Sequence, residues 1–179
     1  MDNPPAHSFS RSPVQEVFCL CTRGSDAEPL TLTVPRPYPG WPHIRGRITD
    51  MIDGAGEISR ITGCTLQYTD LIPVVDGMEL PGIEDIGRVL SGRFNCFVDT
   101  AKSEIMLIGT KIPDTEGSVF SMDNRPGTPG WTLIFTMSIE RPSGFVSGES
   151  VVNWFDAARA GIHGLFDLIV PEEIVQSLR

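Results

Sequence analysis

The chain has 179 residues, of which 40% are hydrophobic and 21% are charged, and its formal net charge is −9. This length is enough for one sizeable core and short for two, and the composition is too apolar for a disordered chain. The acidic balance, without any cluster of lysines and arginines, disfavours binding to a nucleic-acid backbone. We therefore expect a single globular domain with no nucleic-acid partner.

The sequence shows neither a signal peptide nor a membrane-spanning segment. Residues 1–13 contain neither the basic nor the apolar segment of a signal peptide. No apolar run approaches the roughly 20 residues that cross a bilayer. We expect a cytoplasmic protein with no membrane attachment and with reduced, mostly buried thiols, which are Cys19, Cys21, Cys64 and Cys96.

The first half of the chain predicts three strands and one helix after a loose N-terminal arm at residues 1–13. Strand-forming composition at 14–21 and alternating leucine and threonine at 29–34 predict two strands. Hydrophobic residues then recur at helical spacing over 41–52, with a proline in the first turn and glycines just beyond the end. This pattern predicts an amphipathic helix. Residues 57–70 predict a long strand.

The next part of the chain predicts a hairpin between two irregular segments. Residues 71–92 are rich in proline and glycine, with a short helix over 83–90. Residues 93–100 and 104–112 then predict paired strands. Residues 113–130 are too long and too broken for a simple turn, so we expect a functional or mobile loop there.

The C-terminal part predicts one more strand and a long helix. Residues 131–140 place every second side chain, from Trp131 to Ile139, on one face. The closing helix is expected to begin at Ser150 as its N-cap and to end before Pro171, which starts a short helical turn over 171–178. Its apolar stripe is Val151, Phe155, Ala158, Ile162, Leu165, Phe166 and Ile169.

The order of these elements predicts an α+β fold. We expect a single antiparallel β-sheet of about six strands, with the helix of the N-terminal half and the long C-terminal helix packed on one face. Residues 14–179 are expected to form one domain.

The segment WFDAARAGIHGLFD, residues 154–167, contains a lone histidine. His163 lies one helical turn from Arg159 and one from Asp167, and the spacing places all three opposite the apolar stripe. A His–Asp pair can transfer protons, but no nucleophile accompanies it and an exposed helix surface does not exclude water. We interpret His163 as a solvent-facing residue in a salt-bridged row, and we assign no catalytic residue.

A neighbouring face of the same helix carries small residues and is a candidate interface. Two interior glycines cost about 1 kcal/mol each relative to alanine, and close approach of another backbone would offset that cost. Tight packing against the sheet and a homodimer seam both remain open. We expect self-association through an exposed sheet edge or through this face, which consists of Trp154, Ala157, Gly161, Gly164 and Leu168.

The search for catalytic and cofactor motifs is negative. The segment GAGEIS (54–59) shares only two glycines with a dinucleotide fingerprint and follows a predicted helix, not a strand. Phosphate-binding loops, serine elbows and zinc-protease motifs are missing. Cys19 and Cys21 share one strand face, but they lack a second cysteine pair and are more typical of buried thiols than of a metal site. We expect no cofactor and no metal, and an enzymatic role is disfavoured but open.

Three stretches resemble a sporadically distributed prokaryotic family of uncharacterised proteins. They are PVQEVF near the start, the helix that opens at Trp41 and leads into ISRITGCTLQYTDLIPV, and the end VVNWFDAARAGIHGLFDLIVPEEIVQSL. The last two look like that family's Arg-x-Gly-containing strand and its closing helix. Because the family has no established activity, the resemblance supports the architecture and leaves the function open.

Two classes of function follow from this sequence. The favoured one is a non-catalytic binding or protein-interaction module, homodimeric or bound to a protein partner. The alternative is a small-molecule-binding protein or enzyme with a cavity between a curved sheet and the C-terminal helix, as in helix-grip folds. In that case Arg60, on the inward parity of its strand, would anchor a small anionic ligand, with Tyr68 and Trp131 lining the cavity. A closed cavity lined by these residues would favour the alternative, and a filled core would favour the first class.

Overall fold

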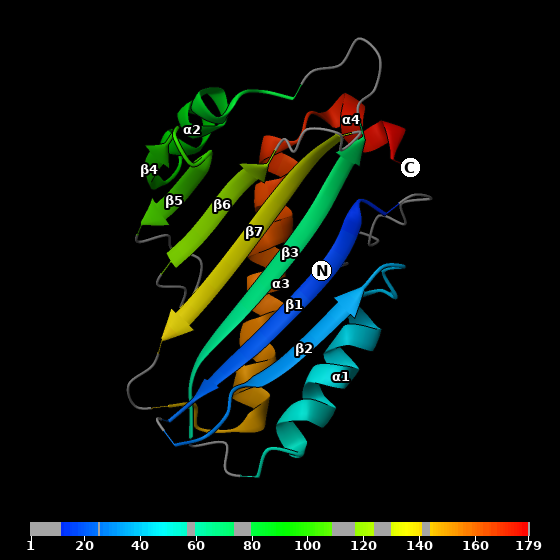
Figure 1. Ribbon diagram of the computed structural model, residues 1–179, viewed down its shortest axis with the longest axis vertical. Helices are drawn as coiled ribbons and strands as arrows, with labels where there is room; N and C mark the ends of the chain where they lie inside the picture. The colour runs from blue at the N-terminus through cyan, green and yellow to red at the C-terminus, as the bar shows by residue number, and fades with distance from the viewer. Residues whose placement is uncertain are drawn as a thin grey trace, which may run out of the picture.

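One antiparallel sheet with helices on a single face organises the protein, as the computed structural model shows (Figure 1). The structure describes residues 12–24, 26–56, 60–73, 80–108, 117–123, 130–140 and 144–178. The strands are β1 (Val14–Arg23), β2 (Leu30–Pro35), β3 (Ile61–Pro73), β4 (Asn95–Asp99), β5 (Glu104–Ile108), β6 (Gly117–Asp123) and β7 (Gly130–Glu140). The helices are α1 (Trp41–Asp53), α2 (Ile83–Ser91), α3 (Gly148–Ile169) and α4 (Glu172–Ser177). The order across the sheet is β2-β1-β3-β7-β6-β5-β4.

The predicted α+β class with an antiparallel sheet is confirmed, whereas the expected strand count is one too low. The described residues form seven strands, and the additional one is β6, which lies in the segment 113–130 that we expected to be a loop. Its sequence, GSVFSMD, has a weak strand signal by itself, but it pairs with β5 on one side and β7 on the other. Pairing on both sides outweighs the weak local preference. Residues 113–116 and 124–129 of that segment, and residues 1–11 of the expected arm, lie outside the described residues.

Alternation along the central strands produces one apolar face and one hydroxyl-rich face. Leu66 and Tyr68 of β3 stand opposite Met137 and Phe135 of β7, and all four side chains are buried. The intervening positions face the other way and form polar bridges. On that side the hydroxyl oxygens of Thr65 and Ser138 are 3.0 Å apart, and the hydroxyl of Thr136 donates to the Gln67 side-chain oxygen at 3.3 Å. The two faces therefore have opposite chemistry.

The helices α1, α2 and α3 pack against the apolar face of the sheet. α1 packs against β2 and α3, α3 packs against β3 and β7, and α2 packs against β4 and β5. In Figure 1 the long α3 runs behind the middle of the sheet, with α1 beside it. None of the helices in the described residues is long and apolar enough to cross a bilayer. The hydroxyl-rich face carries no helix in this view.

The long helix α3 begins and packs almost as its sequence predicts. The Ser147 side chain accepts a hydrogen bond from the Ser150 amide at 3.1 Å, and the Ser150 hydroxyl accepts one from the Ser147 amide at 3.2 Å. The N-cap is therefore Ser147, three residues before the predicted Ser150, because a reciprocal capping box uses both serines. The predicted apolar stripe is confirmed, because every member of it is buried.

The start of α1 is joined to the middle of α3. Asp156 accepts a hydrogen bond from the Trp41 indole nitrogen at 2.7 Å and one from the Arg45 Nε at 2.9 Å. The buried side of α1 consists of Trp41, Ile44, Ile48 and Ile52, which is the predicted helical spacing. The two helices therefore meet at a polar junction beside the sheet.

Candidate functional site

The three residues predicted to bind a ligand are dispersed. Arg60 is exposed and precedes β3, which begins at Ile61, so the expectation that it faces inward is wrong. The alternation of buried positions is interrupted before Cys64, where the pairing of β3 with β1 shifts register between Gly63 and Ile61. Trp131 is half-buried opposite Ile72. It lies roughly 13 Å along β7 from Phe135, the partner of Tyr68. Only Tyr68 lies buried in the layer between sheet and helix, with 2% of its surface exposed.

Tyr68 belongs to a polar cluster where β3, α3 and the start of α1 meet, and this polar cluster is defined by Tyr38, Tyr68, Arg159 and His163. The hydroxyl oxygens of the two tyrosines are 3.4 Å apart. The ring of His163 stands edge-on to that of Tyr68, with centroids 6.1 Å apart. His163 is exposed, and Tyr38 and Arg159 are half-buried, so the cluster connects the buried Tyr68 to the surface.

The Tyr68 phenol is held in its neutral form. Burial is the main cause that raises its pKa far above the ordinary value, and the nearby Tyr38 adds to the rise. The positive charge of Arg159 opposes it, which places the guanidinium electrostatically close to the phenol. A neutral phenol offers one hydrogen-bond donor and can accept as well, and it is a poor general base.

Arg159 is turned toward α1, which corrects the expected row of Arg159, His163 and Asp167 on the solvent side of α3. Its guanidinium carbon lies 5.5 Å from the centroid of the Trp41 ring, a cation–π contact. Its Nε is buried without a hydrogen-bond partner. The ion pairs among the described residues do not include Arg159, and the neighbouring Asp156 is already bound by Trp41 and Arg45.

His163 is exposed, as predicted, but its ring also contacts the buried Tyr68. Its ring lies against the Tyr68 ring at 74°, so one side of the imidazole covers the phenol. The neighbouring position on α3 is open, because among the described residues no atom, apart from the helix backbone and the two chain neighbours of Gly164, lies within 4 Å of the position that a Cβ would take there. His163 is therefore a surface residue at the border of the polar cluster.

Asp70 is a buried acid that the sequence reasoning did not single out. It is the inward residue after Tyr68 on β3, 3% of its surface is exposed, and desolvation raises the pKa of its carboxyl from 3.8 to about 7. A strongly perturbed acid beside a polar cluster is a mark of functional sites. A signal was present, because an aspartate on the inward parity of a strand is unusual.

The predicted small-residue interface is divided between buried and exposed positions. Trp154 is 4% exposed and its ring centroid lies 5.1 Å from that of Phe155, so Trp154 is covered within the chain itself. Gly164 is exposed, while Ala157, Gly161 and Leu168 are half-buried. No close backbone contact explains Gly164. Self-association through this face stays a prediction.

A shallow groove runs between α1 and the first turns of α3. Its volume is about 210 Å³, and polar side chains such as Arg45, Asp53 and Glu149 line much of it. This is smaller than the roughly 300–1,000 Å³ of ordinary ligand sites. Within the described ranges, no three histidine, cysteine or acidic side chains gather closely enough to hold a metal ion.

Comparison of the chain with protein-family models, curated proteins and solved structures found no match. The chemistry of the site is therefore argued from its own residues. The polar cluster supplies hydroxyl groups, a guanidinium and an imidazole, and its phenol is neutral. This set is suited to hydrogen bonding with a bound molecule.

Proposed function

We propose that the protein is a non-catalytic binding protein whose ligand site is the polar cluster of Tyr38, Tyr68, Arg159 and His163. One observation carries the proposal: polar side chains from three separate segments converge on a buried hydroxyl within an otherwise apolar layer between sheet and helices. Burying such groups costs free energy unless they are paired, and ligand binding is a reason to retain them. The cysteines form no disulfide and three of the four are buried, which supports the cytoplasm as the site of action.

The substitution Tyr68→Phe tests this proposal, because it removes the hydroxyl and keeps the ring. A panel of small acids, amides and sugars is screened by thermal shift and ligand-observed NMR. We expect at least one compound to bind the wild-type protein and to bind Tyr68→Phe about fivefold to tenfold more weakly, since a hydrogen bond is worth about 1 kcal/mol. Thr65→Val is the matched control, because it removes a hydroxyl on the other face of the same strand. Binding that is weakened equally by both changes, or by neither, would contradict the proposal.

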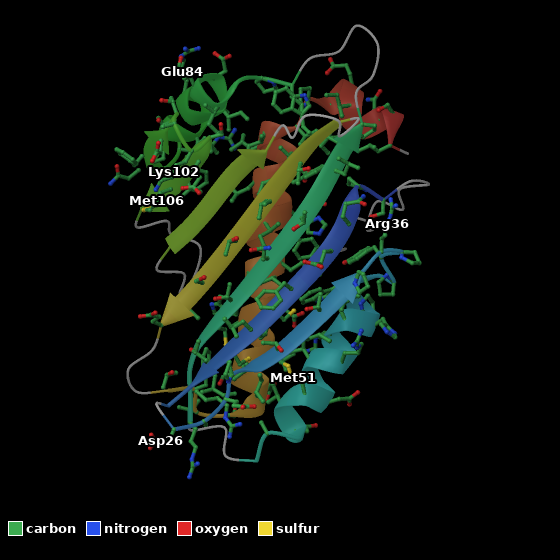
Figure 2. The ribbon with its side chains drawn as sticks, viewed as in Figure 1. Asp26, Arg36, Met51, Glu84, Lys102 and Met106 are labelled. Atoms are coloured by element: carbon green, nitrogen blue, oxygen red, sulfur yellow. The ribbon has the colours of Figure 1, made fainter. Side chains whose placement is uncertain are left out.

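A second function, self-association, is favoured by an exposed hydrophobic pair at the sheet edge. Phe97 of β4 and Met106 of β5 are cross-strand partners, 59% and 49% exposed. Figure 2 shows Met106 near Lys102 in this hairpin, far from Met51 of α1. β4 is an edge strand, and the unpaired backbone of such a strand is a template for another strand. We propose that the partner is a second copy of this chain, and that the two β4 edge strands pair with each other.

The edge-to-edge dimer predicts a clear change in mass. Phe97→Thr combined with Met106→Thr should convert a dimer into a monomer, as measured by sedimentation velocity or by light scattering after size exclusion. Gly161→Leu is the comparison variant, because it alters the small-residue face of α3 and leaves the edge intact. If Gly161→Leu alone dissociates the dimer, the interface lies on the small-residue face of α3 and not at the sheet edge. A wild-type protein that is monomeric at high micromolar concentration would exclude both interfaces.

A further inference from the structure

We infer that the ligand of the polar cluster is a small organic anion, and that Arg159 binds its carboxylate. This inference rests on the proposed function, because it names the ligand class of the same site. Arg159 differs from Arg60, the anchor that the sequence suggested, in standing at the border of the layer between sheet and helices.

The first argument is that Arg159 has no ion-pair partner among the described residues. The acid nearest in sequence, Asp156, is engaged by the Trp41 indole and by Arg45, at 2.7 and 2.9 Å. Arg159 itself lies over the Trp41 ring, 5.5 Å from its centroid. Stacking uses the flat face of a guanidinium and leaves the N–H groups at its edge available for a carboxylate. Its Nε is buried and has no hydrogen-bond partner, so the fold leaves one donor of this guanidinium unsatisfied.

The second argument is the supply of further donors around that charge. The Tyr38 and Tyr68 hydroxyls lie 3.4 Å apart, and the positive charge of Arg159 acts on the pKa of Tyr68 and lowers it. Two hydroxyls bonded to each other use one proton, and the other remains for an acceptor.

The third argument is the start of α1, whose first residue is Trp41. Its N-cap, Gly40, provides no side-chain cap, and the first turn contains no acidic residue. The amides of a helix start and the positive end of its dipole favour negative charge. The first turn therefore has neither a side-chain cap nor an acidic residue of its own, and the Asp156 carboxylate bound by the Trp41 indole is shared with Arg45. These observations agree on a ligand that accepts hydrogen bonds and carries negative charge.

The experiment compares two probes of the same shape and different charge on the full-length protein. Benzoate and benzamide are titrated by ¹H–¹⁵N NMR, with the indole signal of Trp41 as the local reporter, and inorganic phosphate serves as a third probe. We expect saturable shifts with benzoate, little response to benzamide, and a loss of about tenfold or more in benzoate affinity in Arg159→Gln. Arg88→Gln is the control, because it removes the same charge from an exposed position on α2. Benzoate affinity in this control should match the wild type.

The outcomes separate the ligand class from the binding function. Phosphate that binds more tightly than benzoate, with the same loss in Arg159→Gln, supports an anion site and assigns it to phosphate in place of a carboxylate. Equal binding of benzoate and benzamide, weakened by Tyr68→Phe but unchanged in Arg159→Gln, overturns the anion inference and leaves the binding function standing. No saturable response to either anion up to about 50 mM also overturns the inference, whereas the wider screen still decides the proposed function.

Discussion

Replacing Phe166 by alanine should lower the free energy of unfolding by about 3–5 kcal/mol, the usual cost of truncating a buried phenylalanine. Phe166 is 7% exposed on α3, and its ring centroid lies 6.2 Å from that of Phe135 on β7. The substitution removes this aromatic pair and leaves a cavity between the helix and the middle of the sheet, which the surrounding strands can fill only in part.

Chemical denaturation followed by circular dichroism measures this loss. Val146→Ala is the control, because Val146 is 95% exposed and its truncation should change the free energy of unfolding by less than about 0.5 kcal/mol. A loss under about 1 kcal/mol in Phe166→Ala would mean that α3 contributes far less to the core than its burial implies.

Asp70→Asn should stabilise the protein at pH 8 by roughly 2–4 kcal/mol and should have little effect near pH 3. Desolvation raises the pKa of the Asp70 carboxyl from 3.8 to about 7 in the folded protein. The folded state therefore binds more protons than the unfolded state between these values, and the free energy of unfolding falls as the pH rises from about 4 to about 7. Asparagine keeps the shape of the side chain and removes the charge that the folded protein holds at high pH.

Denaturation of the wild type and Asp70→Asn across this pH range measures the effect. The difference in stability should increase between pH 4 and pH 7 and then become constant. Asp85→Asn is the control, since Asp85 is exposed and joined to Arg88 in a surface ion pair, which contributes about 0–1 kcal/mol. A difference that does not depend on pH would mean that the Asp70 carboxyl is solvated.

The elements with a clear period could be predicted from the sequence alone. α1 and α3 carry apolar residues at helical spacing, and β7 alternates strictly over its length, so their predicted faces agree with the observed burial. β6 could not be predicted, because it becomes a strand through its two neighbours. Arg60 shows a related limit, because β3 begins only after it and because a register shift between Gly63 and Ile61 interrupts the alternation that the sequence suggested.

The candidate site could be predicted only in part. Tyr68 could be predicted because it lies on the inward side of the alternating pattern of β3. Tyr38 and Arg159 could not, because they meet Tyr68 through the packing of a loop and two helices, and no local pattern records that meeting. Asp70 carried a local signal in its inward parity, which the search for known motifs passed over.

The pairing of β3 with β7 makes the three outer strands an insertion into a hairpin. Pro73, where β3 ends, stands opposite Gly130, where β7 begins. The chain thus departs and returns at neighbouring points, and α2, β4, β5 and β6 all lie between them in the sequence. The four strands β2, β1, β3 and β7, together with α1 and α3, contain every residue of the polar cluster or border the loop that carries Tyr38. Evolution could therefore lengthen, shorten or exchange the outer half of the sheet at this junction without moving the polar cluster.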